Sequence, residues 1–230
     1  MRASWNHVCV AGFGTAKPDE VWTSDAIEAR LGPLYHRLNL PQGRLELMTG
    51  IKERRHWSLP VKPSQAGTEA ALDLIEKLGL DPLSIDCVVH AAVCRDRLEP
   101  ATAAYVHGAL GLRPDAPFFD LSNACLGVVQ SMALAASWIE TGLMRSVLIV
   151  AGENGQALLE DTIRELLGGV HDRQSIKPYF ANLTIGSGAV AVLLTHASLA
   201  PKRALTLKAA VSYSDTDARF LCQGGDSLQM

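Results

Sequence analysis

The sequence predicts an α/β fold, with a mixed, five-stranded sheet and a buried central helix. Two observations carry this prediction: short apolar runs alternate with helical patterns, and 48% of the 230 residues are hydrophobic. The alternation is typical of βαβ units, and a chain of this size and composition buries enough apolar surface to form a core.

The expected strands are five apolar runs bounded by turn residues or helical patterns, at 8–11, 87–92, 117–121, 146–151 and 188–195. Gly12 and Gly14 should end the first run. The last run is continuously apolar, which indicates a strand covered on both faces. Residues 205–212 form one more candidate strand.

Three helical patterns lie between these strands. Ser64–Leu78 begins with a cap-competent serine, repeats an apolar residue at every fourth position and ends before Gly79. Residues 102–110 form a shorter helix. From Cys125 to Ile139 nearly every residue is apolar or small, and a helix that is hydrophobic all round belongs in the centre of a domain. Residues 22–63 are polar and rich in proline, and we expect them to form an insertion.

The charge and the apolar pattern exclude several classes of function. Lys and Arg number 21 against 24 Asp and Glu, and the net charge of −3 lacks the basic footprint of nucleic-acid binding. No apolar run reaches the roughly 18 to 20 residues of a membrane span, and the first residues do not resemble a signal peptide. We therefore expect a cytoplasmic protein with no nucleic-acid partner and no membrane span.

The cysteines and histidines do not indicate a metal site. Five cysteines are scattered singly, at 9, 87, 94, 125 and 222. Their total is odd and no C-x-x-C pair occurs, which argues against a zinc site and against a disulfide framework. The seven histidines show no metal-ligand spacing either. We expect reduced thiols and no metal.

Cys125 is the main candidate for a nucleophile, because it follows a strand and a tight turn and begins the most apolar helix. The free N–H groups and the macrodipole of a helix N-terminus favour the thiolate form of a thiol, which is the attacking species in acyl transfer. The same N–H groups can hold an oxyanion, each contributing about 3 kcal/mol. The alternative is a buried structural cysteine, the commoner fate of this residue type.

The segment Phe119–Gly127 resembles the nucleophile motif of the 3-oxoacyl-[acyl-carrier-protein] synthase III branch of the thiolase superfamily. Four further segments follow in the order of that family, at 10–14, 49–55, 151–153 and 184–191. Each is weak alone, but the ordered set covers most of the chain. The resemblance implies a thiolase-like βαβαβαββ half with Cys125 as the acyl-accepting nucleophile.

A narrower resemblance adds a second catalytic candidate. The segments Cys94–Pro100, Asn123–Gly127 and Leu221–Gly225 resemble the olefin-biosynthesis branch, whose members condense two fatty acyl-CoAs head to head. In that branch the glutamate of a Leu-Glu-Pro element reaches across the dimer and activates the second acyl chain. Glu99 occupies this position, and the alternative is an ordinary exposed acid in a loop.

The resemblance also implies the reaction and its ligands. A Claisen condensation of fatty acyl thioesters would pass through an acyl group on Cys125, with acyl-CoA or acyl carrier protein as substrate and no metal or redox cofactor. Lys52, Arg54 and Arg55 lie near where the family meets the phosphates and adenine of coenzyme A. Their alternative is a solvated basic loop.

The family fold is pseudo-duplicated, and its second half supplies a histidine and an asparagine that have no counterpart here. We expect residues 1–200 to form the thiolase-like N-terminal domain, and residues 201–230 to start a truncated C-terminal half. The partner would be a second copy or a thiolase-type C-terminal half. Two alternatives remain open: a non-catalytic subunit that pairs with a full-length homologue, and an inert remnant.

Overall fold

The computed structural model describes residues 2–58 and 61–220. The chain divides into two compact units. Unit 1 comprises Met1–Lys17, Pro60–Glu153 and Gly188–Tyr213. Unit 2 comprises Pro18–Leu59, Asn154–Ser187 and Ser214–Met230. The expected insertion at 22–63 thus overlaps a unit that also takes in residues 154–187.

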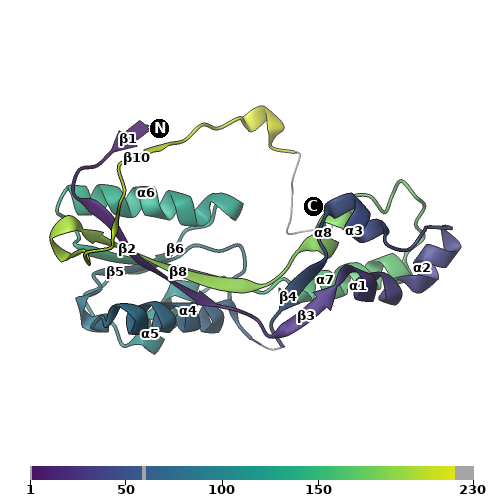
Figure 1. Cartoon of the computed structure of the whole chain (residues 1–230), viewed down its shortest axis with the longest axis horizontal. Coiled ribbons are helices and arrows are strands. Elements are labelled where there is room, and N and C mark those ends of the chain that lie inside the picture. The colour runs from purple at the N-terminus through teal and green to yellow at the C-terminus, as the bar shows by residue number, and fades with distance from the viewer. Residues whose placement is uncertain (1, 59–60, 221–230) are drawn as a thin grey trace. The chain divides into compact units, whose positions relative to one another are not determined.

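Unit 1 is built on a mixed sheet with the strand order β6-β5-β7-β8-β2-β9 (Figure 1). Its strands are β2 (Val8–Ala16), β5 (Cys87–His90), β6 (Phe118–Asp120), β7 (Ser146–Glu153), β8 (Gly188–His196) and β9 (Leu205–Thr206). The strands β5, β6 and β7 run parallel, whereas β8 is antiparallel to both β7 and β2.

The prediction of five strands is one too few. The sixth strand is β9, which pairs with β2 through Cys9–Thr206 and Val10–Leu205. The strand expected at 205–212 therefore splits in two, and its second part, β10 (Ala209–Val211), pairs with β1 (Arg2–Ser4). Both parts join the N-terminal segment because their backbone groups find partners there.

The first strand is also longer than predicted, because β2 continues through Gly12 and Gly14 to Ala16. The helix α4 (Pro63–Leu78) crosses this strand so closely that a side chain on Gly14 would overlap the Ala70 carbonyl oxygen. A register shift between Val10 and Gly12 accompanies the crossing. The glycines allow a close backbone approach here and do not end the strand.

Helices cover both faces of the sheet of unit 1 (Figure 1). The helices α4 and α5 (Thr102–Leu110) lie on one face, and α6 (Gly127–Glu140) lies on the other. Ala135, Ala136 and Ile139 of α6 pack against apolar residues of β2, β5, β7 and β8. This contact forms the main core of unit 1.

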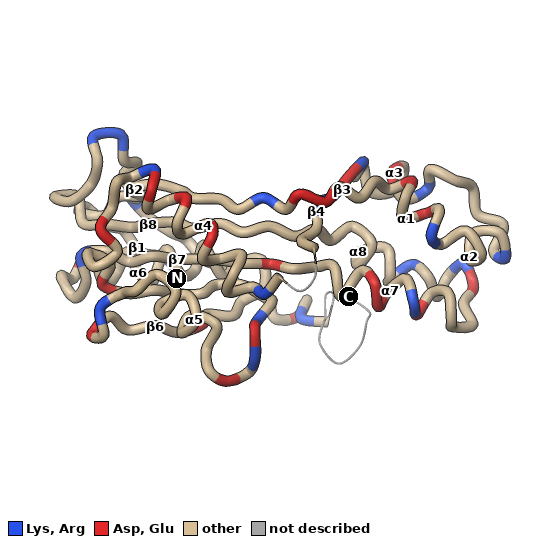
Figure 2. Tube along the Cα trace, turned by 90° about the horizontal axis from the view of Figure 1, so that it is seen from below, with Lys and Arg blue, Asp and Glu red and all other residues tan. Residues whose placement is uncertain are grey.

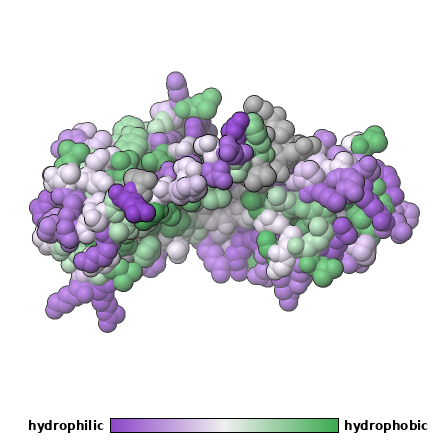
Figure 3. Space-filling view, turned by 90° about the horizontal axis from the view of Figure 1, so that it is seen from above, coloured by the Kyte–Doolittle hydropathy of each residue, from purple (hydrophilic) through white to green (hydrophobic). Residues whose placement is uncertain are grey.

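The expectation that this apolar helix is buried on all sides is wrong for the part of the chain that the structure describes. Only the face of α6 toward the sheet is covered, while Val129 is 59% exposed and Leu134 38% exposed. Figure 3, which looks onto the α6 side of the sheet, shows green apolar residues gathered on this face. One sheet can cover only one side of a helix, so the opposite side needs a further layer.

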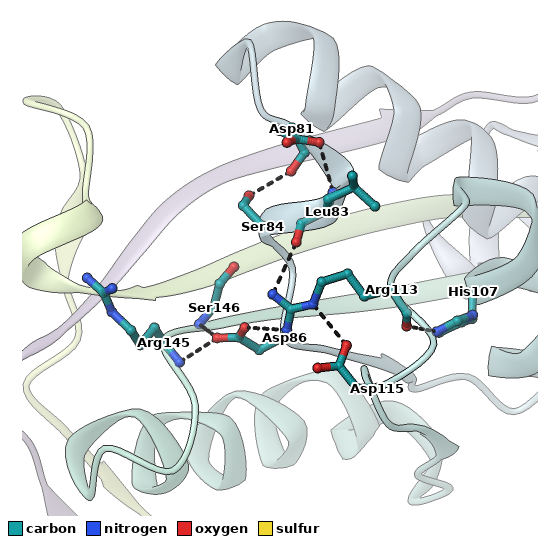
Figure 4. A network of polar contacts seen from close by, with 9 residues as sticks. All are labelled: Asp81, Leu83, Ser84, Asp86, His107, Arg113, Asp115, Arg145 and Ser146. Atoms are coloured by element: carbon teal, nitrogen blue, oxygen red, sulfur yellow. Dashed lines mark hydrogen bonds and ion pairs between the residues drawn. The ribbon is translucent and has the colours of Figure 1, made fainter.

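A polar network closes the amino-terminal end of the parallel strands (Figure 4). Asp86 accepts hydrogen bonds from the backbone N–H groups of Arg145 and Ser146, at 2.7 and 3.1 Å. It also accepts one from the guanidinium of Arg113 at 3.0 Å. These bonds hold the starts of β5 and β7 together. The opposite, carboxyl-terminal end is where α/β sheets place their binding sites.

Unit 2 is a β-hairpin packed with short helices. Its elements are β3 (Glu20–Thr23), α1 (Ser24–Arg30), α2 (Gly32–Arg37), α3 (Arg44–Thr49), β4 (Glu53–His56), α7 (Gln156–Gly168) and α8 (Tyr179–Thr184). Ile27, Leu31 and Leu159 are buried at its centre. Short 3-10 turns complete the described chain, at Pro82–Ser84 (η1), Ala124–Leu126 (η2), Ala197–Leu199 (η3) and Thr216–Ala218 (η4). Basic and acidic residues intermix along the trace of both units (Figure 2).

Candidate active site

Cys125 lies in η2, the short turn that joins β6 to α6, and its side chain is exposed. This exposed position differs from the buried one that the alternative of a structural cysteine expects. The structure also corrects the predicted helix start, because α6 begins at Gly127 and Cys125 precedes it in a 3-10 turn. The tighter turn arises because the chain must reverse sharply between the strand and the helix, and 3-10 geometry is common at helix ends.

The backbone around Cys125 is strained and tightly packed. Ala124 has a φ of +43°, a conformation that costs a residue with a side chain on the order of 1 kcal/mol. A Cβ on Gly127 would lie 3.3 Å from the Ala91 carbonyl oxygen and 3.5 Å from that of Leu121. The start of α6 thus packs directly against the carboxyl ends of β5 and β6. Such strain is typical of residues that present a reactive group.

Glu99 lies in the loop Val93–Ala101, between β5 and α5, and its side chain is exposed. Two carboxylates hold the first part of this loop. Glu153 accepts hydrogen bonds from the N–H groups of Val93 and Cys94, at 2.7 and 3.1 Å. Asp96 accepts from the Ser64 backbone N–H at 2.9 Å and from its hydroxyl at 2.6 Å. The loop is therefore fixed at its base while Glu99 remains accessible.

The three predicted coenzyme A contacts belong to unit 2, and the hairpin separates them. Lys52 is exposed just before β4, and Arg55 on β4 is partly exposed and donates to the Pro18 carbonyl at 3.2 Å. Arg54 is buried and donates to the Ser24 hydroxyl at 3.0 Å. Burial lowers the pKa of Arg54. Neighbouring strand residues face opposite sides, so Arg54 and Arg55 cannot face the same ligand from this strand.

Sequence reasoning did not assign a role to Asp96, Asp120 or Glu153, whose carboxylates bind backbone N–H groups around the Glu99 loop. The available signal was the position of Asp120 and Glu153 at the ends of parallel strands, the edge where sites gather. The segment Leu221–Gly225, which also resembles the olefin-biosynthesis branch, lies outside the described residues.

Within the described ranges, no group of three or more His, Cys, Asp or Glu side chains is arranged to hold a metal ion. The helices in those ranges also lack the combination of length and apolar character that crossing a membrane requires.

Comparison with known proteins shows which family the chain resembles. Residues 119–213 match the family described as 3-oxoacyl-[acyl-carrier-protein (ACP)] synthase III. The chain is 40% identical over 179 residues to the acyl-CoA:acyl-CoA alkyltransferase of Shewanella oneidensis. It is 32% identical over 220 residues to the protein of the same name in Xanthomonas campestris. The chain is thus similar to the thiolase-like synthase III family over most of its own length. The predicted α/β thiolase-like fold and the resemblance stated from the sequence are confirmed, apart from the number of strands and the burial of the central helix.

Solved structures agree with this assignment. A crystal structure of Xanthomonas campestris OleA matches with a TM-score of 0.92 at 31% identity, over 97% of this chain and 64% of that chain. Another holds lauric acid and lauroyl-CoA, with a TM-score of 0.83 at 31% identity, and the match covers 86% of this chain and 59% of that chain. The match to the Shewanella oneidensis alkyltransferase covers 78% of this chain and 51% of that protein. The match to the Xanthomonas campestris alkyltransferase covers 96% of this chain and 65% of that protein. It therefore spans about half to two thirds of the length of these relatives.

The OleA crystal structures include variants of one glutamate and of one cysteine. These two residues stand the same number of positions apart in that protein as Glu99 and Cys125 do in this chain.

Proposed function

We propose that the chain is the nucleophile-bearing part of an acyltransferase that condenses two fatty acyl thioesters in a Claisen reaction. The observation that carries this proposal is the exposed Cys125 in a strained turn at the start of α6. Its thiol is open to a substrate, and the N–H groups of the first turn can stabilise an oxyanion beside it. The names of the most similar relatives support the reaction class.

In the first step the Cys125 thiolate attacks the carbonyl carbon of an acyl-CoA. The bond from that carbon to the coenzyme A sulfur breaks, and coenzyme A leaves as a thiol after taking up the cysteine proton. In the second step a base removes a proton from the α-carbon of another acyl thioester. The carbanion attacks the acyl group on Cys125, the thiolate is expelled, and a β-ketoacyl thioester is released. Neither step needs a redox cofactor, because no carbon is oxidised or reduced by an external agent.

Glu99 is the proposed base of the second step. Its exposed position on a loop that is fixed at its base suits a group that acts on a substrate held by another subunit. The matching separation of the glutamate and the cysteine in OleA supports this role. A carboxylate can remove an α-proton when the acyl chain lies within hydrogen-bonding distance.

Coenzyme A thioesters are the proposed substrates, and acyl carrier protein thioesters are the second candidate because of the family description. The OleA structure that holds lauroyl-CoA supports the first choice. Lys52 and Arg55 are the proposed phosphate contacts, since both keep accessible positive charge. Arg54 is less suited to this role, because its guanidinium is buried inside unit 2 and donates to the Ser24 hydroxyl.

The proposed assembly is a homodimer, or a pairing with a thiolase-type C-terminal half, in the cytoplasm as part of fatty acid metabolism. The exposed Val129 and Leu134 of α6 support the pairing, because a large apolar surface is seldom left in water. The same surface favours a second candidate, a non-catalytic subunit that binds a full-length homologue. An accessible cysteine counts against it.

The test is acylation of Cys125. We expect the chain, assembled with a thiolase-type C-terminal half and given lauroyl-CoA, to gain the mass of one acyl group in intact-mass spectrometry. Cys125→Ala should abolish the adduct, and Cys94→Ala, which removes a less exposed thiol, should retain it. An adduct that persists in Cys125→Ala would refute the assignment. A chain that binds its partner without any adduct would support the non-catalytic subunit.

A further inference from the structure

Asp120, the last residue of β6, holds the start of α5. Its carboxylate accepts hydrogen bonds from the N–H groups of Thr102 and Ala103, both at 2.8 Å. These are the first residues of α5, whose N-terminal N–H groups have no partner within the helix. The cap position is Ala101, and its side chain cannot accept a hydrogen bond. A carboxylate from a neighbouring strand therefore takes over the capping role, and its negative charge suits a helix N-terminus.

The same residue lies between the two candidate catalytic segments. Glu99 precedes the capped residues Thr102 and Ala103 by a few positions, and Cys125 follows Asp120 after a short turn. We propose that Asp120 is a positioning residue, which fixes the downstream end of the Glu99 loop relative to the turn that carries Cys125. The inference rests on the proposed function and deepens it.

Loss of the Asp120 carboxylate should affect the loop more than the cysteine turn. The turn has its own backbone support, because the Leu121 N–H donates to the His90 carbonyl at 2.9 Å and the start of α6 packs on Ala91. The loop, in contrast, would keep its upstream attachments at Glu153 and Asp96, and the hydrogen bond from the Asp96 N–H to the Thr102 hydroxyl at 3.2 Å. Its downstream end would lose two charge-assisted hydrogen bonds.

The surroundings of Asp120 make this contact strong. The His90 ring is 1% exposed, and its Nδ1 lies 4.0 Å from the nearer Asp120 carboxylate oxygen. Neither ring nitrogen of His90 has a hydrogen-bond partner among the described residues. A buried neighbour of this kind keeps water away from one side of the carboxylate, and hydrogen bonds are stronger in such a low-dielectric environment.

The first test is hydrogen exchange on the whole chain, which does not depend on activity. In Asp120→Ala we expect exchange in the segment 95–104 to be about tenfold faster than in the wild type, as for the loss of a helix cap. Asp120→Asn keeps one acceptor oxygen and should give a smaller increase. Asp86→Ala is the matched control, because Asp86 also binds two backbone N–H groups but at the opposite end of the sheet. Unchanged exchange in Asp120→Ala, or an equal change in Asp86→Ala, would overturn the inference.

The second test separates the two chemical steps in the assembled enzyme. Asp120→Ala should form the Cys125 adduct within about twofold of the wild-type rate but condense about tenfold or more slowly, because misplacement of a catalytic group lowers the rate of its own step. Asp120→Asn should recover part of the condensation. An equal loss of both steps, or wild-type condensation, contradicts a positioning role. Failure of the wild type to form any adduct defeats the proposed function, and the exchange experiment still decides whether Asp120 holds the loop.

Discussion

At the scale of single residues, the sequence indicates the position of Cys125 but not the backbone conformation of the residue before it. The order strand, turn, cysteine and apolar helix is visible in the sequence, and it indicates a thiol near a helix N-terminus. The positive φ of Ala124 is not visible, because alanine has no preference for that conformation. It results from packing the start of α6 against the ends of β5 and β6.

Arg54 and Arg55 show the reverse case, in which neighbours in the sequence part in space. Both belong to one basic segment, but β4 pairs with β3 and directs them to opposite sides. Arg54 becomes part of the interior of unit 2, where it donates to Ser24 and to the Trp22 carbonyl. Only Arg55 and the preceding Lys52 keep access to solvent.

Replacement of Glu99 gives a prediction at this scale. Glu99→Gln should spare acylation of Cys125 and slow condensation by about a hundredfold or more, the range for loss of a general base. The measurements are intact mass for the adduct and chromatography for the β-ketoacyl product. Glu69→Gln is the control, since Glu69 is an exposed acid on α4 outside the loop. Loss of both steps in Glu99→Gln would instead indicate a structural role.

At the scale of elements, the crossing of α4 over β2 and β7 sets the shape of unit 1. The sequence places the body of the helix and its end at Gly79 correctly, because the apolar spacing and the glycine are local signals. The predicted cap is wrong: the N-cap is Lys62, and Ser64 lies inside the first turn, where its hydroxyl donates to Asp96. The closeness of the crossing depends on Gly14 and Gly152, where an added Cβ would meet the backbone of α4. In the sequence alone, a glycine in a strand is equally consistent with a turn.

Gly14→Ala tests this crossing. The added methyl group would overlap the Ala70 carbonyl and the Leu74 backbone, which cannot move without shifting α4. We expect the free energy of unfolding to fall by about 2 to 3 kcal/mol, measured by urea denaturation. Gly188→Ala in β8 is the matched control, because its added Cβ would meet no atom within 4 Å. Equal stability of the two variants would show that the crossing is looser than the structure indicates.

At the scale of the whole molecule, the candidate residues are divided between the two units. Cys125 and Glu99 belong to unit 1, whereas Lys52 and Arg55 belong to unit 2. Each unit also encloses a buried histidine, His90 in unit 1 and His56 in unit 2. Burial lowers the pKa of both histidines, and for His90 the carboxylates of its surroundings act in the opposite direction.

These histidines predict a pH dependence of stability. The unfolded chain binds a proton near the ordinary histidine pKa of 6.5, while the folded state resists it because burial lowers the pKa of His90. The contribution of neutral His90 to the free energy of unfolding is therefore fully present above pH 6.5. It is lost as the pH falls from 6.5 toward the lower pKa of His90 in the folded state. For His90 the opposing charges are Asp120, Glu153 and Asp96, and Arg95 acts with burial.

Urea denaturation at a series of pH values checks this prediction. His90→Leu should reduce the loss of stability below pH 6.5, because leucine cannot bind a proton. Within residues 2–58 and 61–220 the His90 ring makes no hydrogen bond that the substitution would remove. The control His36→Gln replaces an exposed histidine of α2 and should leave the pH dependence of the free energy of unfolding unchanged. If the free energy of unfolding depends on pH in the same way in the wild type and in His90→Leu, the prediction is wrong.

The sequence alone indicated the α/β class, five strands and three helices of unit 1, and Cys125 and Glu99 as candidates. These follow from local signals: periodicity, caps and short motifs whose residues are neighbours in the chain. Only the tertiary structure decided that Arg54 faces inward, that Asp120 caps α5, that Gly14 admits α4 and that one face of α6 stays exposed. Each of these depends on segments far apart in the sequence, whose contacts no local pattern records.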